Sequence, residues 1–176
     1  MDAFMEEKWN ADESKTVKDA LVEKVAVIGE NLKIRRFEKV VAENGCVVSY
    51  IHGGGRIGVL VVADTDVVND DIKACLKNVA MQVAAMNPIA VDEAGVPADV
   101  LEKEKEIAAD KARQEGKPEN MIEKIAMGRI SKFYKEVCLL KQEYIQDGKM
   151  TVAEYLKSVD KDLTVTAFKR FTLRAE

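Results

Sequence analysis

Few residues in this sequence could carry out covalent chemistry. The 176 residues include one histidine, His52, and three cysteines, of which Cys46 lies closest to it. A thiol beside an imidazole is a familiar arrangement for a nucleophile, provided that a third group orients the imidazole. No such group is evident here, and Cys46 falls inside a β-rich pattern. The sequence therefore favours a structural role for Cys46 over a small enzyme that uses Cys46 and His52.

The cysteines and the histidine also argue against a metal site. Cys46, Cys75 and Cys138 are widely spaced, odd in number and without a CxxC motif. This pattern is unlike a disulfide framework or a zinc site. A single histidine excludes a histidine cluster. We therefore expect reduced thiols in a cytoplasmic protein, with no catalytic residue, no metal and no cofactor.

The glycine run after His52 has two interpretations. A phosphate-binding loop would need the GK[ST] ending of a Walker A motif and a following helix, whereas Gly53-Gly54-Gly55-Arg56 precedes a strand pattern. A hairpin turn fits better, because glycines accept unusual backbone angles and let another protein's backbone come close. A histidine at such a turn could contact a partner, and the residue types alone leave this open.

Charge and hydropathy exclude several classes of function. The formal net charge is −4, and acids such as Glu102, Glu104 and Glu106 alternate with lysines. Mixed charges of this kind usually cover solvated helix faces. An acidic chain is a poor candidate for nucleic-acid or anionic-membrane binding, so we expect neither. We also expect no signal peptide and no transmembrane helix, because no apolar run is long enough.

The residue pattern in the first part of the chain predicts a helix followed by a sheet. Residues 1–13 suggest a short helix and a turn, from which Phe4, Met5 and Trp9 pack against the body. Ser14 is the expected N-cap of a helix that ends at Gly29. The apolar stripe of this helix is Val17, Leu21, Val25 and Ile28.

Three β-rich stretches follow, residues 32–41, 46–51 and 56–63, with turns at Asn44-Gly45 and at the glycine run. Together they predict a three-stranded antiparallel meander. The run 163–173 near the end of the chain is expected to return to the same sheet.

The remaining pattern predicts helices. One begins at Asn69 or Asp70 and ends at Asn87-Pro88. Its expected buried stripe is Ile72, Cys75, Leu76, Val79, Val83 and Met86. Residues 97–140 form two amphipathic stretches around Gly116-Lys117-Pro118, as in an antiparallel helical hairpin. Thr151 and Glu154 make a capping-box pattern for a last short helix.

The predicted fold class is α+β: an antiparallel sheet covered by helices on one side, with a protruding antiparallel helical hairpin. In domain terms, we predict an α+β core formed by 1–96 and 141–176. The hairpin, 97–140, is inserted in it.

Several segments, in order, resemble bacterial elongation factor Ts. They cover about residues 15 to 173 and are VAVIGENLKIRR (25–36), SYIHGGGRIGVL (49–60), MQVAAMNP (81–88), GKPENMIEKIAMGRISKF (116–133) and KRF (169–171). One such segment would be weak evidence, whereas five in family order are specific. The hairpin 97–140 is similar to the coiled-coil module of the family.

The resemblance implies binding to the GTPase elongation factor Tu and catalysed release of its GDP in protein biosynthesis. By matching motifs, the implied contacts are Ile28 and Gly29 with the nucleotide-binding domain of the GTPase, and His52 with one of its β-domains. Gly53, Gly54 and Arg56 belong to the same hairpin motif. The hairpin 97–140 implies self-association, as in some members.

One departure from the family pattern affects these expectations. The N-terminal helical domain and the threonine–aspartate–phenylalanine element, whose aromatic ring reaches the magnesium site, find no match; residues 2–4, Asp-Ala-Phe, are not this element. We therefore interpret the chain as a fragment with weakened exchange activity. The alternative function is a structural dimerisation module without exchange activity of its own.

Overall fold

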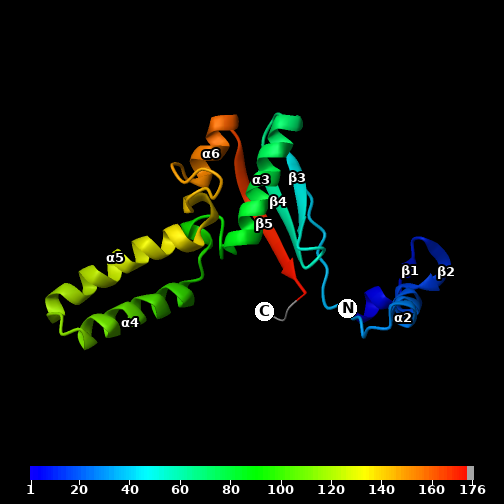
Figure 1. The fold of residues 1–176 in the computed structure, drawn as a ribbon, viewed down its shortest axis with the longest axis horizontal. Coiled ribbons are helices and arrows are strands. Elements are labelled where there is room, and N and C mark those ends of the chain that lie inside the picture. The colour runs from blue at the N-terminus through cyan, green and yellow to red at the C-terminus, as the bar shows by residue number, and fades with distance from the viewer. Residues whose placement is uncertain (174–176) are drawn as a thin grey trace. The chain divides into compact units, whose positions relative to one another are not determined.

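The computed structural model describes residues 1–173 and separates into two compact units, residues 1–39 and the chain from residue 40 onward. Together their elements make an α+β fold, as the sequence predicts (Figure 1). The division into a core, 1–96 with 141–176, and an inserted hairpin, 97–140, stays a prediction.

The first unit begins with short elements. Helix α1 spans Asp2–Met5, and the strands β1 (Lys8–Trp9) and β2 (Asp12–Thr16) pair antiparallel. The expected short helix is present, but this strand pair was not predicted from the sequence. Phe4 packs on Phe37, with ring centroids 4.3 Å apart.

Helix α2 spans Val17–Ile28, and its N-cap is Thr16, so the prediction of Ser14 is wrong. The Thr16 hydroxyl accepts a hydrogen bond from the Asp19 amide (3.1 Å), and the Asp19 carboxylate accepts one from the Thr16 amide (3.0 Å). Ser14 instead donates to Asp12, and it lies two residues before the N-cap. Gly29 is the C-cap at φ 77°, as predicted.

Residues 32–41 do not form a strand, which corrects the predicted meander. Alternating apolar residues show that a segment could cover a surface, but a strand also needs a neighbour that accepts its backbone hydrogen bonds. No strand ladder among residues 1–173 includes this segment, and its backbone has no regular secondary structure.

The sheet of the second unit has the order β3-β4-β5, with both pairs antiparallel. Its strands are β3 (Cys46–His52), β4 (Ile57–Asp64) and β5 (Thr164–Thr172). The last run of the sequence therefore returns to the sheet as predicted, and it takes the outer position beside β4. Across the sheet, Tyr50 pairs with Val59 and Val59 with Arg170.

Helix α3, Asp70–Met86, lies against one face of this sheet (Figure 1). Its N-cap is Asn69, whose side-chain oxygen accepts a hydrogen bond from the Ile72 amide at 2.9 Å. Its C-cap is Asn87, which has a φ of 45°. The predicted stripe is buried except for Met86, which is 46% exposed. Met86 stands in the last turn, where the chain leaves the core, so periodicity alone overestimated its burial.

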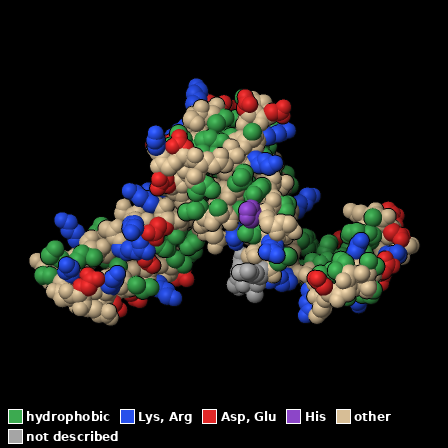
Figure 2. Space-filling view, in the orientation of Figure 1, with side chains coloured by type: hydrophobic (Ala, Val, Ile, Leu, Met, Phe, Trp, Pro, Cys, Tyr) green, Lys and Arg blue, Asp and Glu red, His purple; other side chains and the backbone are tan. Residues whose placement is uncertain are grey.

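The helical hairpin consists of α4 (Ala98–Gln114) and α5 (Glu119–Val137), which lie side by side (Figure 1). The small Ala108 and Ala112 of α4 are buried, together with four apolar residues of α5: Ile122, Ala126, Ile130 and Phe133. Arg129 Nε also donates to Glu104 Oε1 at 2.7 Å. Charges of both signs are interspersed over the exposed surface of the hairpin (Figure 2).

Three short elements complete the second unit. They are the 3-10 turns Glu93–Gly95 and Leu139–Lys141 and the helix α6 (Val152–Val159), which Thr151 and Glu154 cap reciprocally as predicted. None of the helices within residues 1–173 has both the length and the apolar character that a bilayer crossing requires.

A buried pair of glutamines joins α3 to the end of the hairpin. Gln82 and Gln142 are 0% and 1% exposed. The Gln82 amide nitrogen donates to Gln142 Oε1 (3.2 Å) and to the Glu143 carbonyl (3.0 Å), and Gln82 Oε1 accepts from the Ile145 amide (3.0 Å). Every polar atom of the Gln82 side chain is thus satisfied inside the protein.

The three cysteines differ in accessibility. Cys75 and Cys138 are buried, and burial is the main cause that raises the pKa of each thiol. Cys46 is partly exposed at the start of β3.

We expect Gln82→Leu to lower the free energy of unfolding of the second unit by about 2–4 kcal/mol. Several buried groups would lose their hydrogen-bond partner, and each unsatisfied group costs about 1–3 kcal/mol of stability. The total is expected to be smaller than the sum, because the surrounding structure can relax in part. Near-UV circular dichroism in urea is a suitable measurement, because Tyr144 and Tyr155 stack in this unit with centroids 4.1 Å apart.

The matched control is Gln114→Leu, since Gln114 is exposed near the end of α4. We expect it to change stability by less than about 0.5 kcal/mol. Equal effects of the two substitutions would contradict the structural role of the Gln82 network.

We also predict that one thiol of the native protein reacts with a disulfide reagent well before the other two. The fast thiol is Cys46, because a buried thiol with a raised pKa forms little thiolate and is shielded from the reagent. Cys46→Ser should remove the fast phase, whereas Cys75→Ser should leave it unchanged. A fast phase that survives Cys46→Ser would contradict the assignment.

Candidate protein-binding surfaces

The connection between β3 and β4 is a turn of four residues, Gly53 to Arg56. Its three glycines have φ of 61°, 67° and 95°, in the region that other residues rarely adopt. The turn is closed by the Arg56 amide, which donates to the His52 carbonyl at 3.1 Å. A Cβ atom at Gly54 or Gly55 would meet no atom within 4 Å. The backbone angles require glycine here, and the space around the turn is open to another protein.

His52 ends β3 directly before this turn, and its side chain is exposed. The single histidine is visible at the surface in Figure 2. Its Nδ1 lies 2.9 Å from the Tyr50 hydroxyl, and the two rings are 5.8 Å apart between centroids. Tyr50 is partly buried and packs on the main core. The imidazole is therefore tethered to the sheet although it faces solvent.

The Cys46–His52 pair considered from the sequence does not form. Cys46 pairs with Ala63 at one end of the β3–β4 ladder, and His52 pairs with Ile57 at the other end. Six residues of extended chain separate them, which corresponds to about 20 Å. Among residues 1–173 there is also no group of three or more His, Cys, Asp or Glu placed to hold a metal ion.

The end of α2 forms a second exposed feature, in the first unit. Ile28 is 53% exposed, and Val27 is 83% exposed. The Gly29 amide donates to the Val25 carbonyl at 2.9 Å and closes the helix. Of the predicted apolar stripe only Val17 is buried. Leu21 and Val25 are partly buried, so the apolar surface that is accessible to other molecules includes Val27 and Ile28 at the end of the helix.

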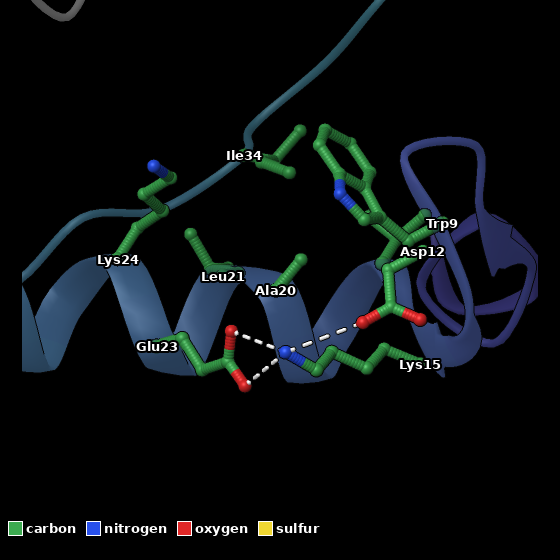
Figure 3. Close-up of a pocket in the computed structure, with 9 residues that line it drawn as sticks. Trp9, Asp12, Lys15, Ala20, Leu21, Glu23, Lys24 and Ile34 are labelled. Atoms are coloured by element: carbon green, nitrogen blue, oxygen red, sulfur yellow. Dashed lines mark hydrogen bonds and ion pairs between the residues drawn. The ribbon is translucent and has the colours of Figure 1, made fainter.

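An apolar groove of about 300 Å³ lies along the same helix (Figure 3). Trp9, Leu21 and Ile34 face one another across it. Lys15 borders the groove, and its ammonium lies 2.8 Å from Glu23, which raises the pKa of Lys15. Leu21 and Ile28 are seven residues apart and so share one face of the helix. An apolar strip therefore runs from the groove toward the helix end.

The structure brings the predicted residues together in two groups. Ile28 and Gly29 lie in the first unit. His52, Gly53, Gly54 and Arg56 lie on or beside one turn of the second unit. The sequence reasoning missed the contact of Tyr50 with His52 and the groove at Trp9. Tyr50 had a usable signal, because residues two apart in a strand share a face.

Comparison with known proteins assigns this sequence to a family. The family model described as "Elongation factor TS" matches residues 1–175. A protein of Clostridium botulinum named "Elongation factor Ts" is 48% identical over 172 residues, which cover 96% of this chain and 56% of the relative. One of Clostridium kluyveri with the same name is 45% identical over 175 residues, which cover 97% of this chain and 57% of the relative.

The chain thus spans little more than half the length of the curated relatives that it matches. The match nevertheless extends over nearly all of its own residues, and it includes the helix end at Gly29, the glycine turn after His52 and the helical hairpin. On this evidence, the chain belongs to the elongation factor Ts family.

Proposed function

We propose that this chain is a protein-binding module that binds the GTPase elongation factor Tu and promotes release of its GDP during translation. The observation that carries this proposal is the open turn Gly53 to Arg56, with the exposed His52 at its start. Family membership supports the choice of partner. The exposed end of α2 at Ile28 and Gly29 is the second proposed contact.

The proposed exchange activity needs no covalent step. A protein that binds the nucleotide-free GTPase more tightly than the GDP-bound form lowers the affinity for GDP by the same factor by which GDP lowers its own affinity. Couplings of this kind are typically about 1–3 kcal/mol, or roughly 5–150-fold. A few surface contacts, such as those at His52 and Ile28, can supply energy of this size.

The proposed contacts differ in chemistry and are therefore complementary. Ile28 offers exposed apolar surface, which stabilises an interface by the area removed from water. His52 offers a polar ring, and Gly53 and Gly54 allow a close backbone approach without side chains in the way. Arg56 adds an exposed cation on the same turn.

A second candidate function is dimerisation through the hairpin α4–α5, without exchange activity of its own. Three large apolar side chains of the hairpin support it: Ile107, Met121 and Met127 are 53%, 48% and 65% exposed. Sedimentation at increasing concentration tests this candidate. A dimer that Met127→Lys dissociates would support it, and a monomer at all concentrations would contradict it.

We expect the chain to form a complex with nucleotide-free elongation factor Tu, and to accelerate release of fluorescent GDP less than the full-length Clostridium botulinum relative does. The reason is that this chain matches only part of the relative, so fewer contacts distinguish the two nucleotide states. Titration calorimetry and stopped-flow fluorescence measure the two quantities. Binding without any acceleration would favour the structural alternative, and equal rates would contradict the expected weakening.

We further expect His52→Ala to weaken binding of the GTPase roughly five- to thirtyfold, a loss of about 1–2 kcal/mol, without lowering the melting temperature. The side chain is exposed, so its removal leaves no cavity in the core.

Ser49→Ala serves as the control, because Ser49 is exposed on the same strand at a position facing the opposite side of the sheet. It should leave binding unchanged. A large loss of melting temperature in His52→Ala, or equal binding by both variants, would contradict the contact role of His52.

A further inference from the structure

His52, the only histidine of the chain, makes a hydrogen bond through one of its ring nitrogens. Nδ1 of His52 lies 2.9 Å from the Tyr50 hydroxyl, and Tyr50 itself packs on the main core through its ring. Residues 50 and 52 stand on the same face of β3, since side chains alternate along a strand. Tyr50, which packs on the core, thus makes a hydrogen bond with the exposed imidazole beside the turn.

The direction of this hydrogen bond follows from the chemistry of the two groups. A phenol O–H, with a pKa of about 10, is a far stronger donor than the N–H of a neutral imidazole. The unprotonated imidazole nitrogen is a basic acceptor, whereas the phenol oxygen is a weak one. The stable arrangement therefore has Tyr50 donating to Nδ1.

This direction fixes the tautomer of the ring. When Nδ1 accepts a hydrogen bond, the neutral ring carries its proton on Nε2, which becomes a donor. The three residues that follow His52 are glycines and have no side chains to cover the ring. The exposed imidazole can therefore offer its Nε2–H to another protein.

We propose that Tyr50 is a positioning residue that holds His52 as the Nε2–H tautomer, so that the turn presents a hydrogen-bond donor to an acceptor oxygen on the bound GTPase. The acceptor is a backbone carbonyl or a carboxylate. This inference rests on the proposed function, because it names the chemistry of the contact that His52 makes with the partner.

The first experiment needs only the isolated chain. Imidazole ¹⁵N NMR gives one pair of ring signals, because the sequence has a single histidine. At a pH where the ring is neutral, we expect a protonated Nε2 and an unprotonated, hydrogen-bonded Nδ1. Tyr50→Phe should shift the Nδ1 signal toward the value of a nitrogen without a hydrogen bond. A protonated Nδ1 in the wild type, or no shift in Tyr50→Phe, would overturn the proposal.

The second experiment compares two substitutions at position 52. The amide nitrogen of glutamine can take the place of Nε2, and that of asparagine the place of Nδ1. We therefore expect His52→Gln to bind elongation factor Tu within about threefold of the wild type, while His52→Asn loses as much as His52→Ala. Better binding by His52→Asn than by His52→Gln would contradict a donor at the Nε2 position.

A third comparison isolates the role of Tyr50. Tyr50→Phe should weaken binding about three- to tenfold in the wild type, as expected for one hydrogen bond, and should have no further effect in His52→Ala. Tyr134→Phe removes a hydroxyl from the hairpin and is the matched control, with no expected effect. Equal losses from Tyr50→Phe in both backgrounds would show that Tyr50 acts independently of His52.

The experiments distinguish a failure of the proposed function from a failure of the tautomer assignment. If the wild type does not bind the GTPase, the proposed function fails and the partner half of this inference fails with it, while NMR still decides the tautomer. If the wild type binds but carries its proton on Nδ1, the inference about Tyr50 and the Nε2–H donor is refuted, while the proposed function stands.

Discussion

The packing of α3 on one face of the sheet is the interaction on which the second unit depends. Leu76, Val79 and Val83 are 0% exposed and lie in one cluster with Val59 and Val61 of the central strand. Burial of each such side chain contributes about 1.5–3 kcal/mol. This contact fixes the central strand, and the central strand in turn fixes both neighbours through its hydrogen bonds. The turn at the end of β3 and β4 is held in place in this way.

A firm sheet explains how an exposed turn can act as a binding element. The β3–β4 ladder continues to the pair His52 and Ile57, directly beside the glycines. The turn therefore needs little ordering when a partner binds, which reduces the entropic cost of association. The histidine combines solvent exposure with an anchor in Tyr50. Such an arrangement suits recognition of a protein surface, for which no nucleophile, metal or cofactor has to be placed.

Much of this architecture could be predicted from local patterns. The hairpin within 97–140 and the capping of α6 follow from periodicity and end signals, which depend on nearby residues. The interpretation of 32–41 as a strand failed because strand formation depends on a neighbour that the pattern does not specify. The cap at Thr16 was missed because Ser14 and Thr16, two residues apart, are both suitable N-caps, and only the hydrogen bond with Asp19 decides between them. For the site, the glycine turn was evident, whereas the hydrogen bond between Tyr50 and His52 depends on side-chain rotamers.

The central claim is that the glycine turn and the end of α2 bind the GTPase without covalent chemistry. Hydrogen exchange of the chain, with and without nucleotide-free elongation factor Tu, tests it most directly. The account predicts slower exchange in the complex at the amides of Gly29 and of residues 53–56, with α4 unchanged. Slower exchange confined to α4 and α5, or no change anywhere in the chain, would contradict it.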